Sequence, residues 1–304
     1  MRPLVSTTLL FLLLSSAAAA QPRIDNVLVR MVPPGSTSLA GAHMDQLKTT
    51  GFYRRLVEER KLTQVDRFAE ETGFDPRRDV RELLFASTAS GGVLLARGAF
   101  PLHPDIKDTK PLRHGHYTIQ TSGGSGFCIL DGTLAIAGDV KSVTAALDEW
   151  ISGPHTAAQP LLARARAVDP QSQFWGVSSG FAGFLAENMP GAGKGIDFSK
   201  IFRGLEDTWF EATFTTGLQA QVHGVTATEQ DAVNLRDTAK GLIGFGRLSV
   251  PENQPEMLKL WDGITADQEG RSITLRADIP ENLLDRLVRM LSTSGVGRGR
   301  GILP

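Results

Sequence analysis

The sequence predicts an α+β fold made of two tandem copies of an antiparallel hairpin-and-helix domain. Three observations lead to this prediction. Alternating apolar and polar residues form two hairpins in each half, at 81–100 and 126–139 and again at 207–225 and 262–278. Such alternation is typical of antiparallel sheets with one buried face. A helical pattern precedes the first hairpin of each half, and an aspartate able to cap a further helix ends the second hairpin.

The N-terminal residues are typical of a secretory signal peptide. Arg2 supplies a positive charge, residues 4–14 form an apolar run, and Ala18 and Ala20 suit cleavage before Gln21. The apolar run is shorter than the roughly 20 residues that a membrane-spanning helix needs. We therefore expect a periplasmic or secreted protein, with no transmembrane segment after signal cleavage.

Charge and cysteine content exclude several classes of protein. The chain has 32 basic and 33 acidic residues and a formal net charge of −1. This balance argues against nucleic acid as a partner, because that partner requires a concentrated basic surface. Cys128 is the only cysteine, so no intramolecular disulfide can form. The sequence GAGKG at 191–195 lacks the spacing of a phosphate-binding loop, and no cofactor is predicted.

In the first copy, residues 43–73 carry apolar side chains at helical spacing, and Pro76 signals the end of the helical pattern. The hairpin at 81–100 is predicted to turn at Gly91-Gly92. A loop interrupted by prolines is expected after this hairpin.

The second hairpin of this copy is predicted to turn at Asp131-Gly132, a pair that can supply the positive φ of a two-residue turn. This register places Cys128 opposite Ala135, on a face of small side chains. An unpaired cysteine among apolar neighbours behaves as a small hydrophobic residue. Asp139 is expected to cap the helix that follows.

The second copy repeats this order of elements. A short helical pattern at 179–191 precedes a hairpin that turns near Thr216-Gly217. Residues 228–246 then read as a helix, where the first copy has its loop.

The final hairpin is predicted to turn at Glu269-Gly270. Asp278 follows it, and with Glu281 it matches the capping-box pattern of a helix start. The equivalence of Asp139 and Asp278 is the main sign of an internal repeat.

These elements define five segments of the chain. They are a signal peptide (1–20), a first α+β repeat (24–153), a linker (154–168), a second α+β repeat (169–293) and a disordered tail (294–304).

One segment carries a resemblance to known proteins. Residues 72–87, TGFDPRRDVRELLFAS, resemble a segment of uncharacterised exported bacterial proteins with a helix–GxDPxxD–strand arrangement. In those proteins the proline and the second aspartate, which match Pro76 and Asp79, precede the first hairpin. The resemblance implies an exported α+β protein, and it carries no established chemistry or site.

Two sets of residues are candidates for chemistry. Residues 176–180 match the G-x-S-x-G pattern of serine hydrolases, with Ser178 as nucleophile and His223 as the sole histidine downstream. The other interpretation makes Ser178 or Ser179 a helix N-cap, because the surrounding hairpins are antiparallel. His114 and His116 are spaced to bind zinc from one face of a strand, or else they are exposed loop residues.

No catalytic group of residues is complete in the sequence. We therefore expect a non-catalytic exported binding or interaction protein of the bacterial envelope, whose partner is a protein or a small ligand. The alternative is a serine hydrolase that uses Ser178 and His223.

Overall fold

The structure is a computed structural model, and it describes residues 24–59, 65–66, 69–70, 74–88, 91–102, 106, 108–153, 159–180, 204–284 and 286. Several predicted segments lie outside these residues. They are the signal peptide at 1–20, residues 154–158 of the linker, the helix at 179–191 beyond Gly180, residues 287–293 of the second repeat and the tail at 294–304.

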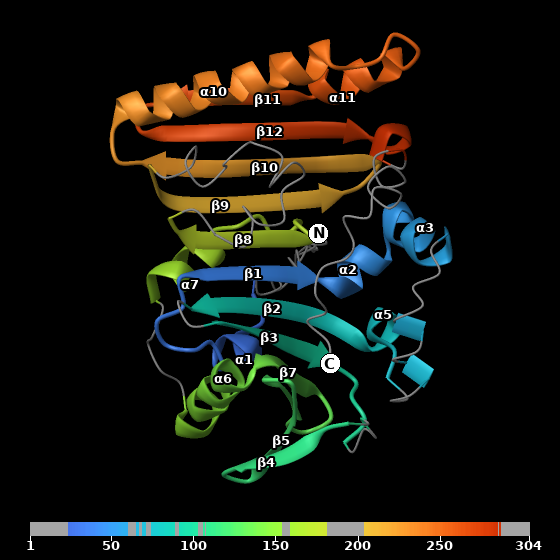
Figure 1. Cartoon of the computed structure of the whole chain (residues 1–304), viewed down its shortest axis with the longest axis vertical. Helices are drawn as coiled ribbons and strands as arrows, with labels where there is room; N and C mark the ends of the chain where they lie inside the picture. The colour runs from blue at the N-terminus through green and yellow to red at the C-terminus, as the bar shows by residue number, and fades with distance from the viewer. Residues whose placement is uncertain are drawn as a thin grey trace, which may run out of the picture.

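A 12-stranded antiparallel sheet is the frame of the protein (Figure 1). Its strands are β1 (Ser38–His43), β2 (Val80–Thr88), β3 (Gly91–Gly98), β4 (Lys110–His114), β5 (Tyr117–Ser122), β6 (Ser125–Ile129), β7 (Leu134–Asp139), β8 (Phe174–Ser179), β9 (Leu205–Phe214), β10 (Gly217–Thr226), β11 (Ile264–Glu269) and β12 (Ser272–Pro280). The predicted α+β class with an antiparallel sheet is confirmed.

Helices connect and cover the strands. The described ones are α1 (Asn26–Val29), α2 (Met44–Lys48), α3 (Gly51–Glu59), α5 (Pro76–Asp79), α6 (Val140–Ser152), α7 (Gln159–Ala165), α10 (Glu229–Leu248) and α11 (Leu258–Asp262), with a 3-10 turn at Pro255–Met257. In the part of the chain that the structure describes, no helix is both long enough and apolar enough to cross a membrane.

One face of the sheet, which we call the α6 face, packs the main core in the N-terminal half. Leu84 and Leu95 from the strands meet Leu28 of α1, Leu147 of α6 and Leu161 of α7 in one cluster of buried side chains. Side chains of a strand point alternately to the two faces, so the apolar residues at every second position of these strands lie together on this face and are buried. In the C-terminal half the same face carries mainly polar side chains, among them Glu211, Gln221 and Arg276, although Trp209 packs against the core.

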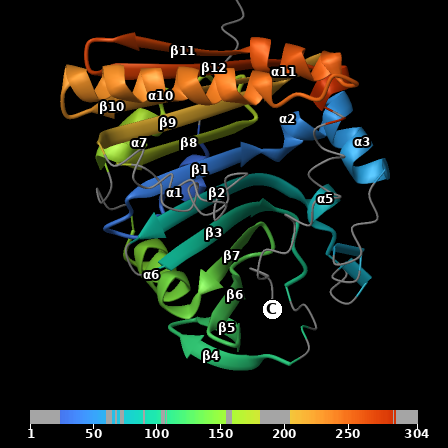
Figure 2. The same cartoon turned by 45° about the horizontal axis from the view of Figure 1, so that its top comes forward.

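The opposite face, which we call the α10 face, is covered by α10 in the C-terminal half. Figure 2 shows α10 lying along the strands of that half, where Leu235 packs on Ile273 of β12. Phe52 of α3 stacks on Phe214 of β9 with ring centroids 4.3 Å apart. A helix of the N-terminal half therefore packs on a strand of the C-terminal half.

The two halves meet at β1 and β8, which pair at the centre of the sheet with Leu39 opposite Val177. Outward from this pair the strand order is β1-β2-β3-β7-β6-β5-β4 on one side and β8-β9-β10-β12-β11 on the other. Gly41 permits the close packing here, because a Cβ at this position would lie 2.3 Å from the Trp175 ring.

The hairpins and α10 form as the sequence predicts, with shifts at the turns. Thr88 pairs with Gly91, so Gly91-Gly92 begin β3 instead of forming the turn. Glu269 pairs with Ser272, which places the final turn one residue later than predicted.

The predicted register at Cys128 is wrong by one residue. Cys128 pairs with Ile136, because the loop contains three residues, Asp131 to Thr133, instead of two. The Asp131 carboxylate accepts a hydrogen bond from the Thr133 N–H at 2.9 Å, which stabilises this longer loop. A one-residue change of register exchanges the faces. Cys128 therefore lies in the main core and not among small residues.

Two other segments differ from prediction. Part of the predicted linker forms α7, because Leu161, Leu162 and Ala165 are spaced to bury one helical face in the core. Part of the predicted loop after β3 forms β4, which pairs with β5 at the edge of the sheet.

The helix cap predicted at Asp278 is also wrong. Asp278 lies within β12 opposite Gln219 of β10, and helical residues begin at Glu281. The Glu281 carboxylate pairs with Arg55 of α3 at 2.5 Å instead of closing a capping box. In contrast, Asp139 caps α6 as predicted, and its carboxylate accepts a hydrogen bond from Ser142 N–H at 2.9 Å.

Candidate functional site

The α10 face of the N-terminal half contains an apolar pocket of about 460 Å³, which we call the Phe74 pocket. Its floor is the surface of four neighbouring strands, β2, β3, β7 and β6. The floor side chains are Leu83, Leu94, Ala96, Ala135, Ala137 and Phe127. Three alanines among these six residues leave space above the sheet that larger side chains would fill.

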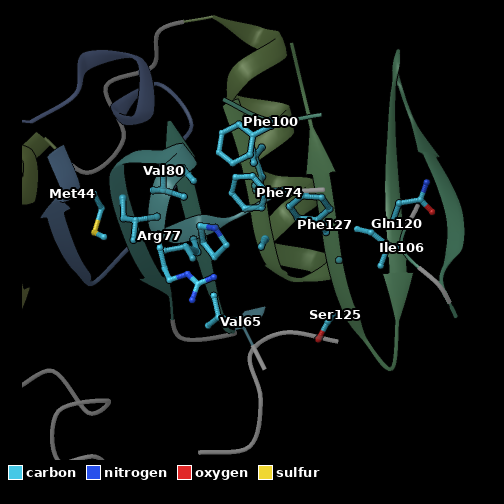
Figure 3. Close-up of a pocket in the computed structure, with 18 of the residues that line it drawn as sticks. Met44, Val65, Phe74, Arg77, Val80, Phe100, Ile106, Gln120, Ser125 and Phe127 are labelled. Atoms are coloured by element: carbon cyan, nitrogen blue, oxygen red, sulfur yellow. The ribbon is translucent and has the colours of Figure 1, made fainter. Parts of the chain in front are cut away.

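Side chains from helices and loops form the opposite wall of the Phe74 pocket (Figure 3). Met44 comes from α2 and Tyr53 from α3, while Phe74 and Phe100 pack together with ring centroids 4.9 Å apart. Segments that are distant in the sequence therefore enclose one apolar space.

The GxDPxxD segment builds the rim of this pocket. Asp75 is the N-cap of α5 and accepts a hydrogen bond from Arg77 N–H at 2.9 Å, while Pro76 occupies the first helical turn. The Asp79 carboxylate accepts a hydrogen bond from Asp75 N–H at 2.9 Å. These contacts place Pro76 and Arg77 beside the pocket, and they explain the motif as a helix-start structure.

The charge of Arg77 is neutralised by two carboxylates. Its guanidinium lies 2.8 Å from Asp66 and 2.8 Å from Asp75. The hydrogen bond from Arg77 is the largest factor that lowers the pKa of Asp75 below its ordinary value. Among the described residues that line the pocket, Arg77 is the only charged one, and it is paired and does not select an anionic ligand.

Two polar side chains of the lining, Thr109 and Gln120, contact each other. Thr109 donates a hydrogen bond to the Ile106 carbonyl at 2.9 Å and contacts the Gln120 side-chain oxygen at 3.2 Å. The rest of the described lining is mainly apolar, so the pocket is suited to an uncharged apolar chain.

Comparisons with known proteins support the fold alone. No protein-family model and no curated protein matches the chain. The chain is similar in structure to crystal form III of TP0453, with a TM-score of 0.51 and 10% sequence identity over 86% of this chain and 97% of that chain. Crystal forms I and IV of TP0453 give TM-scores of 0.47 and 0.48, at 10% and 11% identity, over 90% and 85% of this chain and 98% and 95% of theirs.

The structure does not bring Ser178 and His223 together. Ser178 of β8 pairs with Thr208 of β9, whereas His223 of β10 pairs with the next residue, Trp209. Because successive strand residues face opposite sides, the two side chains lie on opposite faces of the sheet. Ser178 is 5% exposed, and its hydroxyl contacts the Thr37 carbonyl at 3.4 Å.

The glycines of the G-x-S-x-G match have structural roles. A Cβ at Gly176 would lie 2.2 Å from the Phe210 ring, so glycine allows Phe210 to pack on β8. Gly180 has a φ of 80° immediately after the end of β8, a conformation that favours glycine. Ser178 itself lies within the strand and not at a strand-to-helix turn, and the predicted helix that it would cap lies outside the described residues.

His114 and His116 do not share a strand. His114 ends β4, and its Nε2 lies 2.7 Å from the Asp148 carboxylate of α6. His116 is exposed in the turn that follows. Within the described ranges, no group of three or more histidine, cysteine, aspartate or glutamate side chains is placed to hold a metal ion.

Cys128 is 1% exposed, and burial raises the pKa of its thiol to about 11. A thiol that stays protonated at neutral pH is a poor nucleophile, which agrees with a packing role.

Sequence reasoning missed the lining of the Phe74 pocket. The alanines at 96, 135 and 137 lie on adjacent strands, and their small side chains could have indicated an unfilled space above one face of the sheet. Phe74 and Phe100 carried no such signal, because their meeting depends on the tertiary fold.

Proposed function

We propose that the chain is a non-catalytic exported protein of the bacterial envelope that binds an elongated apolar ligand, such as a lipid acyl chain, in the Phe74 pocket. The observation that carries this proposal is an apolar pocket of about 460 Å³ in which Arg77, the charged residue of the described lining, is already paired. Pockets of this volume and apolar lining are typical of small-molecule sites.

Burial of the ligand would supply the affinity. Each buried methylene contributes about 0.8 kcal/mol, so a chain of about eight methylenes gains about 6 kcal/mol before the costs of association. Serine hydrolysis is not part of this proposal, because Ser178 and His223 face opposite sides of the sheet.

A fluorescent rod-shaped hydrocarbon, diphenylhexatriene, tests the pocket directly. Ala137 lies on the floor, so Ala137→Trp should fill the space and remove one bound probe per chain. Thr265→Trp is the matched control, because Thr265 is exposed on the edge strand β11 and should leave the number of bound probes unchanged. Equal numbers of bound probes in Ala137→Trp and the wild type, with both proteins folded, would contradict the proposal.

We also propose that the two halves, 24–153 and 169–293, are copies of one unit. The support is the order of strands outward from the central pair, since β1-β2-β3-β7-β6 and β8-β9-β10-β12-β11 have the same connectivity. In each half the second strand of the final hairpin pairs beside the first hairpin. The connection between hairpins differs, with β4 and β5 in one half and α10 in the other.

Export rests on the signal-peptide pattern of residues 1–20. Mass spectrometry of the protein from the periplasm or medium should find an N-terminus at Gln21. A chain that retains Met1 in the membrane fraction would contradict export with cleavage.

A further inference from the structure

A second apolar cavity, of about 410 Å³, lies between α10 and the strands of the C-terminal half. We call it the Thr208 pocket. Phe210, Val222 and Leu275 line it from β9, β10 and β12, and Leu235 and Leu242 line it from α10. Leu242 is also 36% exposed, so the wall of the cavity reaches the surface at this side chain.

One buried hydroxyl in this cavity has no partner. Thr208 is 3% exposed, and its Oγ1 makes no hydrogen bond. A buried polar group without a partner is costly, and such groups are rare in folded proteins. Thr208 pairs with Gly224 on the face that carries Phe210, so its side chain lies on the side of the sheet where the cavity is.

Charged side chains of these strands lie on the other face. Glu211 pairs with Gln221, which pairs in turn with Arg276. Glu211 and Gln221 border the cavity, but strand alternation directs these side chains to the face opposite Phe210 and Val222. Glu211 accepts a hydrogen bond from Gln221 at 2.6 Å, and Arg276 pairs with Asp267 at 2.9 Å. The charged side chains of Glu211 and Arg276 therefore do not face a ligand in the cavity.

We propose that the Thr208 pocket is a second binding site, which takes an uncharged, elongated apolar molecule with a single hydroxyl or carbonyl oxygen. That oxygen pairs with Thr208 Oγ1, and the apolar body lies between α10 and the sheet. The site is separate from the Phe74 pocket, and its existence does not depend on the function proposed above.

The test uses the uncharged naphthalene ketone prodan as a fluorescent probe, with 1-decanol and decanoate as competitors. Decanol should displace prodan in both the wild type and Ala137→Trp, in which the Phe74 pocket is filled. Decanoate should compete at least about 10-fold more weakly, because a carboxylate without a counter-charge must be desolvated. Equal competition by the two molecules would overturn the proposal.

Three variants, Thr208→Val, Thr208→Ser and Ala220→Trp, assign the binding to this cavity. Thr208→Val keeps the shape and removes the hydroxyl, so it should weaken decanol binding by about 3- to 10-fold, the range of one hydrogen bond. Without ligand, the Thr208→Val protein should be at least as resistant to urea as the wild type, because an unpaired hydroxyl has been removed. Thr208→Ser should retain decanol binding.

Ala220→Trp, which fills the cavity from β10, should abolish the binding of prodan in the Ala137→Trp background. Unchanged decanol affinity in a folded Thr208→Val variant would overturn the role of this hydroxyl and with it the site.

Discussion

The Asp79 carboxylate accepts a hydrogen bond from the backbone N–H of Asp75, with 2.9 Å between Oδ2 and N, and so closes the turn that Pro76 begins. Arg78 donates to the same carboxylate at 2.6 and 2.7 Å. Asp79→Ala should lower the free energy of unfolding by about 1–2 kcal/mol, because it leaves the Asp75 N–H without its acceptor. Urea unfolding measures this loss.

The matched control for Asp79 is Asp237→Ala. Asp237 is exposed on α10 and pairs with its neighbour Arg236, so its removal should change stability by less than about 0.5 kcal/mol. Equal losses in the two variants would show that the GxDPxxD segment is not the structural helix start described above.

The two aspartates that the sequence treats as equivalent should differ in their effect on stability. The Asp139 carboxylate accepts hydrogen bonds from Ser142 N–H and Gly92 N–H at 2.9 and 3.0 Å. Asp139→Ala should therefore cost about 1–3 kcal/mol in urea unfolding. Asp278 is exposed in β12 and caps no helix, so Asp278→Ala should cost less than about 0.5 kcal/mol. Similar losses of stability in both variants would indicate that Asp278 caps a helix, as the sequence predicts.

The contrast between Asp139 and Asp278 shows what local sequence can and cannot predict. Alternation predicts the hairpins because the 2-residue period of a strand is a local property. At Asp278 the local sequence matches a helix cap, but the residue instead pairs with Gln219 of β10 and continues strand β12. The partner strand is distant in the sequence, so the local pattern does not reveal it. The same limit applies at Cys128, where one extra loop residue exchanges the two faces.

The pairing of distant strands and the two pockets could not be predicted from the sequence. The pairing of β1 with β8 joins the halves in one sheet, and no local period specifies a strand's partner. Both pockets depend on helices that pack on strands far away in the chain. Thr208 is an ordinary strand threonine in the sequence, and its importance follows only from its burial and its unpaired hydroxyl.

Two glycines of α10 should respond in opposite directions to alanine. A Cβ at Gly241 would meet no atom within 4 Å, whereas a Cβ at Gly246 would lie 2.4 Å from the Trp261 ring. Gly241→Ala should raise the free energy of unfolding by about 0.5–1 kcal/mol through helix propensity. Gly246→Ala should lower it by about 1–3 kcal/mol through overpacking. Urea unfolding of both variants checks the packing of α10 on α11, and stabilisation by Gly246→Ala would contradict it.

Stability should decrease at mildly acid pH because of His223. Burial is the main cause that lowers the pKa of this imidazole, with a further decrease from Arg276 and an opposing increase from Glu211. A histidine with a lowered folded pKa binds more protons when unfolded. The free energy of unfolding therefore decreases as pH falls below about 6.5, the ordinary value, and on towards the folded pKa.

The variant His223→Phe tests this linkage. Phenylalanine can keep the stacking of His223 on Trp209, whose ring centroid lies 4.6 Å away, but it cannot be protonated. The variant should lose less stability than the wild type between about pH 7.5 and about pH 5. The Thr274 hydroxyl, 3.0 Å from His223 Nδ1, loses its partner in the variant, which changes stability equally at both pH values. The change in the free energy of unfolding between the two pH values thus reports the protonation of the imidazole alone. The control His116→Gln, in an exposed turn, should show the same change in the free energy of unfolding between the two pH values as the wild type. If His223→Phe also shows the wild-type change, the acid sensitivity belongs to another group.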